Sequence, residues 1–216
     1  MAALTGACAA EEKPRIPLGE ARPLTPVTLA APDRSGLLPL SSWPAACDLL
    51  PESSVREVLP TATTMVIDRL APTGAIAEKE QVLPGDAECQ IGVDFAEAKP
   101  VGSGRLPGRI QLTVWVAGTP ELARKTYDEN VALVAGDKRT ACPAELVAAA
   151  GLDACTDEGN SWTFLKNGVA GELRGRAPTL RDGFYFEGRR KGFSNAKVWH
   201  LVVRERLLQA VTARLP

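Results

Sequence analysis

Strict alternation of apolar and polar residues marks the clearest element of the chain, at residues 109–116. The apolar positions in this run are Ile110, Leu112, Val114 and Val116. Because successive side chains of a strand point to opposite faces of a sheet, the run predicts a strand with one buried face. Shorter strand-like runs cover residues 63–69, 89–95, 162–166, 169–176 and 184–186. Asn167-Gly168 separates two of these runs and predicts a tight hairpin, since both residues accept positive φ.

Apolar residues three and four apart predict helices. The helical stretches start at prolines or capping hydroxyls and cover residues 51–59, 119–136, 143–150 and 194–216. Residues 71–87 are loop-like, with a turn at Pro84-Gly85. These elements predict an α+β fold: an antiparallel sheet of about five to six strands, packed by two or three helices and stapled by disulfides.

Proline content divides the chain before residue 44. Seven prolines lie in residues 13–44, which show no amphipathic period. Proline fixes φ and removes a backbone donor, so this stretch predicts an extended, semi-rigid spacer. We therefore expect residual signal or lipobox sequence at residues 1–8, a Pro-rich tether at 9–43 and a single α+β domain at 44–216.

The cysteines indicate an oxidising compartment. Small residues precede Cys8, as at the site where a bacterial lipoprotein is cut and lipidated, which suggests that Met1 lies in or just after a signal sequence. The other four cysteines allow three connectivities. Pairing neighbours in sequence favours Cys47–Cys89 and Cys142–Cys155. Buried free thiols remain an alternative, whereas a metal site is disfavoured because the chain has no CxxC and one histidine.

Charge is unevenly distributed along the chain, although 45% apolar residues leave enough material for a core. Residues 1–165 carry 14 Lys/Arg and 22 Asp/Glu, a net charge of −8, and residues 166–216 carry 11 and 4, a net charge of +7. Period two places Arg174 and Arg176 on one face, which Lys166 is expected to join. An anionic partner for this face would involve Arg174, Arg176, Arg181, Arg189 and Arg190. Pairing of these arginines with the acidic part of the chain is the alternative.

No catalytic constellation is visible in the sequence. His200 is the only histidine and has no flanking motif, so it is expected to be a core or surface residue. Asp153, Asp157 and Glu158 lack the ligand spacing of a calcium loop and are expected to lie in a solvated loop. No nucleotide-binding loop or RNA-binding sheet motif occurs, so we expect neither an enzyme, nor a cofactor, nor a nucleic-acid partner.

The run Cys47-Asp48-Leu49-Leu50-Pro51, followed by a short helix, resembles the opening of the DUF3558 family of actinobacterial lipoproteins. A Pro-rich spacer before this run, and a second cysteine before a strand, extend the similarity over residues 45–215. The resemblance implies a fold and a location at the outer face of the cell membrane or beyond it, and it implies no reaction.

The function expected from these features is that of an exported, lipid-anchored binding or accessory protein of the cell envelope. Its partner would be a ligand or an envelope protein, its contact with the membrane would be through the lipid on Cys8 alone, and it would be a monomer. The alternatives are a secreted enzyme or enzyme inhibitor that uses the Arg-rich hairpin face, and a soluble protein of another role.

Overall fold

The computed structural model describes residues 13–216 apart from 23, 77–78, 97–106, 134–138 and 179–183. Its centre is a seven-stranded antiparallel sheet with the strand order β2-β5-β6-β10-β9-β8-β7. The strands in that order are β2 (Ala62–Leu70), β5 (Glu88–Phe95), β6 (Gly108–Ala117), β10 (Val169–Arg176), β9 (Ser161–Lys166), β8 (Ala154–Asp157) and β7 (Thr140–Ala141). The predicted α+β class is confirmed, and the sheet is wider than predicted because β7 and β8 extend it.

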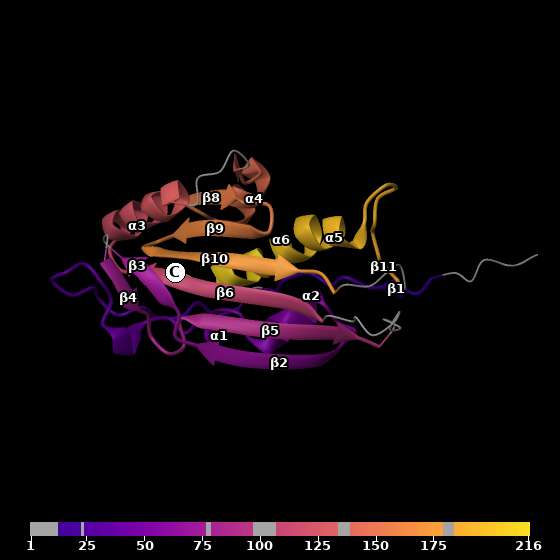
Figure 1. The fold of residues 1–216 in the computed structure, drawn as a ribbon, viewed down its shortest axis with the longest axis horizontal. Helices are drawn as coiled ribbons and strands as arrows, with labels where there is room; N and C mark the ends of the chain where they lie inside the picture. Colours follow the sequence, from indigo (N-terminus) through magenta and orange to yellow (C-terminus); the bar gives the residue numbers. More distant parts are fainter. Residues whose placement is uncertain (1–12, 23, 77–78, 97–106, 134–138, 179–183) are drawn as a thin grey trace, which may run out of the picture.

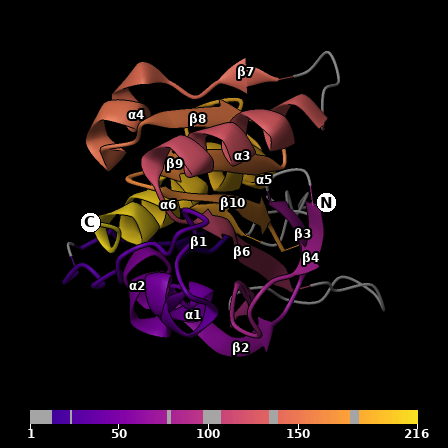
Figure 2. The same cartoon turned by 90° about the vertical axis from the view of Figure 1, so that its left-hand side faces the viewer.

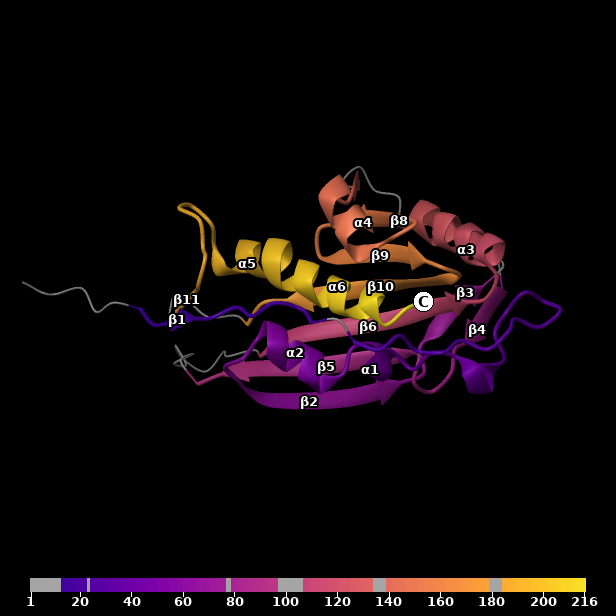
Figure 3. The same cartoon turned by 180° about the vertical axis from the view of Figure 1, so that it is seen from behind.

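Helices cover the two faces of the sheet unequally (Figures 1 and 2). Seen from behind, one face carries the helices α1 (Ala46–Leu49), α2 (Glu52–Val58) and α4 (Ala144–Ala150), and a C-terminal helical run (Figure 3). That run consists of α5 (Asn195–Val198), a π-helical turn (Trp199–Val203) and α6 (Arg204–Ala213). The opposite face carries α3 (Pro120–Leu133) and a hairpin formed by β3 (Thr73–Ile76) and β4 (Lys79–Val82). We call these the α6 face and the α3 face.

The main core lies between the sheet and the helices of the α6 face. The apolar residues of the alternating run, from Ile110 to Val116, are all buried, as their period predicts. Aromatic residues continue this core beyond the sheet, because Phe95 contacts Phe184 and Phe186, and Phe186 contacts Trp199. Burial of this kind of side chain stabilises a fold by about 1.5–3 kcal/mol each. The C-terminal helical run is therefore an integral layer of the domain.

Local sequence signals account for the turns and caps. Asn167 and Gly168 have φ of 45° and 81°, which confirms the predicted hairpin between β9 and β10. Thr119 Oγ1 accepts a hydrogen bond from the backbone of Leu122 at 3.3 Å, as expected of a capping hydroxyl at the start of α3. Gly151 ends α4 with φ of 60°. Residues 71–87, predicted as loop, instead contain the β3–β4 hairpin.

The described part of the Pro-rich segment is extended, as predicted, but several of its apolar residues pack against the domain. Its strand β1 (Arg15–Ile16) pairs in parallel with β11 (Tyr185–Phe186), and the side chain of Ile16 is completely buried. Further along, Val27 N donates to Arg214 O at 2.7 Å. The expected tether at 9–43 is therefore corrected: its apolar residues find partners in the core, and the folded unit begins no later than residue 14. Residues 1–12, including Cys8, lie outside the described residues.

Both predicted disulfides are present. Cys47–Cys89 links α1 to β5, and Cys142–Cys155 links the segment before α4 to β8. All four cysteines of these two disulfides are buried. Among the described residues, no helix combines the length and the hydropathy needed to cross a bilayer.

Candidate functional site

The candidate site is a pocket at the place where β10 is longer than its neighbour β9. Strand β9 pairs with β10 only as far as Ser161 opposite Arg174, whereas β6 pairs with β10 as far as Arg109 opposite Arg176. The notch left beside the end of β10 opens into a pocket of about 360 Å³. Arg109, Arg174 and Arg176 line it from the α3 face, and Trp199 and His200 line it from the C-terminal helical run. The volume is at the lower end of the range typical for small-ligand sites.

Strand register arranges the polar side chains of the α3 face in cross-strand rows. The first row is buried and consists of Glu88, Thr113, Glu172 and Thr163, from β5, β6, β10 and β9. The second row consists of Gln90, Gln111, Arg174 and Ser161, and the third contains Arg109 opposite Arg176. The third row is the most exposed of the three. Its two arginines place positive charge at the pocket end of the sheet.

Arg174 is held by a carboxylate of its own strand. Its Nε donates to Glu172 Oε1 at 2.5 Å, and the Glu172 side chain is only 5% exposed. This hydrogen bond is the main reason why the pKa of Arg174 is raised, and the charges of Glu172, Glu158 and Glu88 add to it. Arg174 therefore has an intramolecular partner, which was the alternative to anion binding, and much of its charge is neutralised.

Arg109 and Arg176 have no such counter-charge. The Arg109 guanidinium contacts the neutral side chain of Gln90, and neither arginine forms an ion pair with any residue in the described part of the chain. Both side chains are exposed. The place of Arg109 beside Arg176 depends on the register between two strands far apart in sequence. Sequence reasoning therefore left it out of the predicted arginine group.

The other predicted cations do not join this pocket. Arg189 stacks on the ring of Tyr185 at 3.8 Å, and neither it nor the exposed Arg190 lines the pocket. Arg181 lies outside the described residues. The prediction for Lys166 was wrong, because this residue projects onto the α6 face, where its Nζ donates to Thr212 O at 2.7 Å. Its register opposite Val169 places it one residue out of phase with Arg174.

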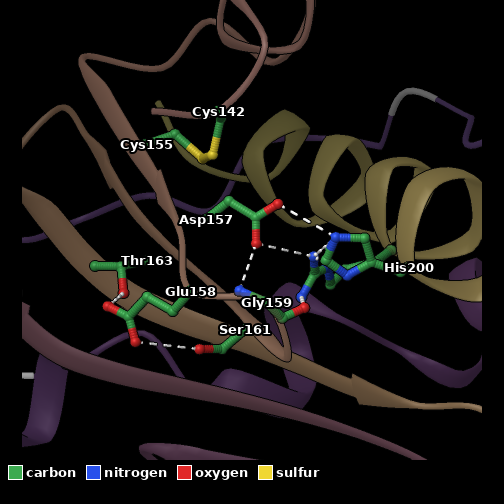
Figure 4. Close-up of polar contacts among 9 residues, drawn as sticks. Cys142, Cys155, Asp157, Glu158, Gly159, Ser161, Thr163 and His200 are labelled. Atoms are coloured by element: carbon green, nitrogen blue, oxygen red, sulfur yellow. Dashed lines mark hydrogen bonds and ion pairs between the residues drawn. A yellow bond between two sulfur atoms is a disulfide. The ribbon is translucent and has the colours of Figure 1, made fainter. Parts of the chain in front are cut away.

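Beneath the pocket, Asp157 joins β8 to the C-terminal helical run (Figure 4). One carboxylate oxygen lies 3.2 Å from His200 Nε2, and the other lies 3.4 Å from Arg204 Nη2. The Arg204 guanidinium is 1% exposed and lies 4.2 Å above the ring of Trp162. Asp157 was expected in a solvated loop, and the structure corrects this: its carboxylate is half-buried and joins two packed layers.

The electrostatics of this cluster favour a structural role for His200. Burial, together with the Arg204 charge, lowers the pKa of His200 below 6.5 against the opposing effect of Asp157. His200 Nε2 faces the Asp157 carboxylate and Nδ1 lies against the Arg204 guanidinium, so both ring nitrogens already have partners within the protein. Burial lowers the pKa of Arg204 to about 10, which still leaves it charged at neutral pH. His200 and Arg204 therefore brace the pocket floor, at a π-helical turn of the kind often found at functional sites.

We expect the free energy of unfolding to decrease as the pH is lowered below 6.5. In the unfolded chain His200 takes up a proton near pH 6.5. In the folded protein its pKa is lower, so it takes up the proton only at a lower pH. The unfolded state therefore binds more protons in this window, and each pH unit removes at most about 1.4 kcal/mol. Urea unfolding at pH 7.5 and pH 5.5 measures the effect. His200→Gln should reduce the difference between the two pH values, and an unchanged difference would contradict this assignment.

The chemistry available at the site is that of binding charged groups. Within the described ranges, no group of three or more His, Cys, Asp or Glu residues could hold a metal ion. No protein-family model, curated protein or solved structure matches the chain.

Proposed function

We propose that the protein is an exported binding protein of the cell envelope that takes an anionic ligand in the pocket at the end of β10. The observation that carries the proposal is that Arg109, Arg174 and Arg176, from two neighbouring strands, line one pocket. Guanidinium groups match carboxylate and phosphate oxygens in geometry and charge. A rigid sheet beneath the arginines supplies the preorganisation that a binding site needs.

The location outside the cytoplasm is supported by the disulfides. Two buried disulfides in one domain are typical of proteins that fold in an oxidising compartment. The resemblance of the Cys47–Pro51 run to an actinobacterial lipoprotein family points to the same place, with Cys8 as the lipidated residue. Metabolic labelling with a fatty acid, compared with a Cys8→Ala variant, tests the anchor. Label that persists in the variant would argue against it.

Anion binding is tested by the melting temperature of the protein in a panel of solutes at low ionic strength. Phosphate, sulfate, succinate and acetate are compared with glucose and glycerol at equal concentration. We expect at least one anion to raise the melting temperature by several degrees and the neutral solutes to leave it unchanged, because a ligand of the folded state stabilises it by mass action. The shift should shrink in 0.5 M sodium chloride, since exposed charges are screened.

A pair of matched variants localises the effect to the pocket. Ala196 is exposed on α5 and lines the pocket, so Ala196→Phe should fill the pocket and remove the anion-dependent shift. Ala144 is equally exposed on α4, away from the pocket, and Ala144→Phe should keep the shift. A panel in which no anion is distinguished from the neutral solutes would refute the proposed function.

A further inference from the structure

We infer that Arg109 and Arg176 together form the seat of a phosphate monoester, bound as its dianion. The inference rests on the proposed function and narrows it to one class of ligand. It is carried by the strand register, by the local balance of charge and by the packing behind the end of β10.

The register places two positive charges directly opposite each other. Arg109 on β6 and Arg176 on β10 are cross-strand partners, and both belong to the α3 face. Side chains in such positions start about 4.5–5.5 Å apart, and like charges directly opposite destabilise a sheet. Gly92 is the cross-strand partner of Arg109 on β5 and provides no side chain to separate or neutralise the pair. A bound anion that touches both guanidiniums would remove this repulsion.

The balance of charge favours a ligand with two negative charges. Arg174, in the adjacent row, is neutralised by the buried carboxylate of Glu172 at 2.5 Å. Behind His200, outside the pocket lining, Arg204 is likewise matched by Asp157. Within the described part of the chain, Arg109 and Arg176 therefore remain as two positive charges without an ion-pair partner. A carboxylate has two oxygens and can occupy one guanidinium fork, whereas the three terminal oxygens of a phosphate monoester can accept from both.

Packing behind β10 prevents the pair from separating. Gly175 lies between Arg174 and Arg176, with its Cα against the indole of Trp199, so close that a Cβ would lie 2.9 Å from the ring nitrogen. Its amide donates to Asn160 O at 3.3 Å, although Asn160 lies just before the first residue of β9. The end of β10 is thus fixed against the C-terminal helical run. The backbone positions from which the two arginines project are therefore held in place by packing.

Neutral hydrogen-bonding groups surround the pair. The side chains of Gln111 and Asn160 line the same pocket. Amides both donate and accept hydrogen bonds, which suits hydroxyl groups on the organic part of the ester. The site therefore fits a phosphate monoester of a polyol better than it fits inorganic phosphate.

Isothermal titration calorimetry at low ionic strength tests the inference. The probes are sn-glycerol 3-phosphate, inorganic phosphate and acetate, titrated into the wild type and into Arg109→Gln, Arg176→Gln and Arg190→Gln. We expect glycerol phosphate to bind most tightly, and each of the first two substitutions to weaken it about tenfold or more, since each removes charge-assisted hydrogen bonds. Arg190→Gln, an exposed cation outside the pocket, should leave the affinity unchanged.

The melting temperatures of the ligand-free variants show whether the pair is structural. Because the two charges repel each other, Arg109→Gln and Arg176→Gln should leave the melting temperature unchanged or raise it. Acetate binding as tightly as glycerol phosphate, or unaltered affinity in both variants, would overturn the phosphate inference while leaving anion binding in place. Inorganic phosphate binding as tightly as the ester would overturn the preference for an ester. If none of the anions binds to the wild type, the proposed function is overturned as well.

Discussion

Replacing the Cys47–Cys89 disulfide by two alanines is expected to lower the free energy of unfolding by about 4 kcal/mol. The bridge closes a loop with a sequence separation of 42 residues, so it removes much of the conformational freedom of the unfolded chain. Both cysteines are also buried in the core between α1 and β5, so small cavities add to the loss. Urea unfolding of Cys47→Ala/Cys89→Ala and the wild type, at the same pH, measures the difference.

The second disulfide provides the matched comparison. Cys142–Cys155 closes a loop with a separation of 13 residues, and its residues are buried to a similar extent. The same chain-entropy argument gives a loss of about 3 kcal/mol for Cys142→Ala/Cys155→Ala. The order of the two losses is therefore the informative result. A larger loss from the shorter loop would show that native packing, and not loop closure, determines what each bridge contributes.

Replacing Asp157 by alanine is expected to cost about 3–5 kcal/mol, a loss typical of breaking a buried ion pair. The substitution removes the carboxylate that faces both His200 and Arg204, and Arg204 is almost completely buried. An uncompensated guanidinium would then remain in the interior. Chemical denaturation of Asp157→Ala at pH 7 measures the effect.

Two controls separate the loss of the ion pair from a general effect of substitution. Asp128→Ala changes an exposed carboxylate on α3 and should alter the stability by less than about 0.5 kcal/mol. Arg204→Met in the Asp157→Ala background removes the unpaired charge and keeps an apolar side chain over Trp162. This double variant should recover much of the stability. An Asp157→Ala protein as stable as the wild type would show that the pair contributes nothing.

Elements with a strong local signal were predictable from the sequence. The strands at 63–69, 89–95 and 109–116 correspond to β2, β5 and β6, and for 109–116 the alternation of apolar and polar residues alone specifies a half-buried strand. The Asn167-Gly168 turn was predictable for an equally local reason, its two positive φ angles. Both disulfides followed from pairing neighbours in sequence.

Features that depend on distant contacts were not predictable. The segment 13–43 has the composition of a free spacer, and only long-range contacts, such as the pairing of β1 with β11 and the bond from Val27 to Arg214, show that it belongs to the domain. The hairpin at 73–82 has few of the β-branched and aromatic residues that mark strands. The predicted helix at 194–216 contains a π-helical turn at Trp199–Val203, which its local sequence does not indicate.

Some features of the candidate site were also predictable from local sequence, and others depend on distant contacts. Period two placed Arg174 and Arg176 on one face, and the register of β10 agrees with this. The partnership of Arg109 with Arg176 requires knowledge of which strands are neighbours. Asp157 and Arg204 are 47 residues apart, and the sequence around either residue does not indicate their contact. Charge composition indicated a basic region but could not show which arginines already had carboxylate partners.

The contacts between the two ends of the chain have a kinetic consequence. Arg206 donates to the carbonyl of Gly19 at 2.7 Å across 187 residues of sequence, and the parallel pairing of β1 with β11 spans nearly as far. Contacts of such high order are slow to form, because long stretches of chain must close first. Native closure therefore waits until the last helix has been synthesised.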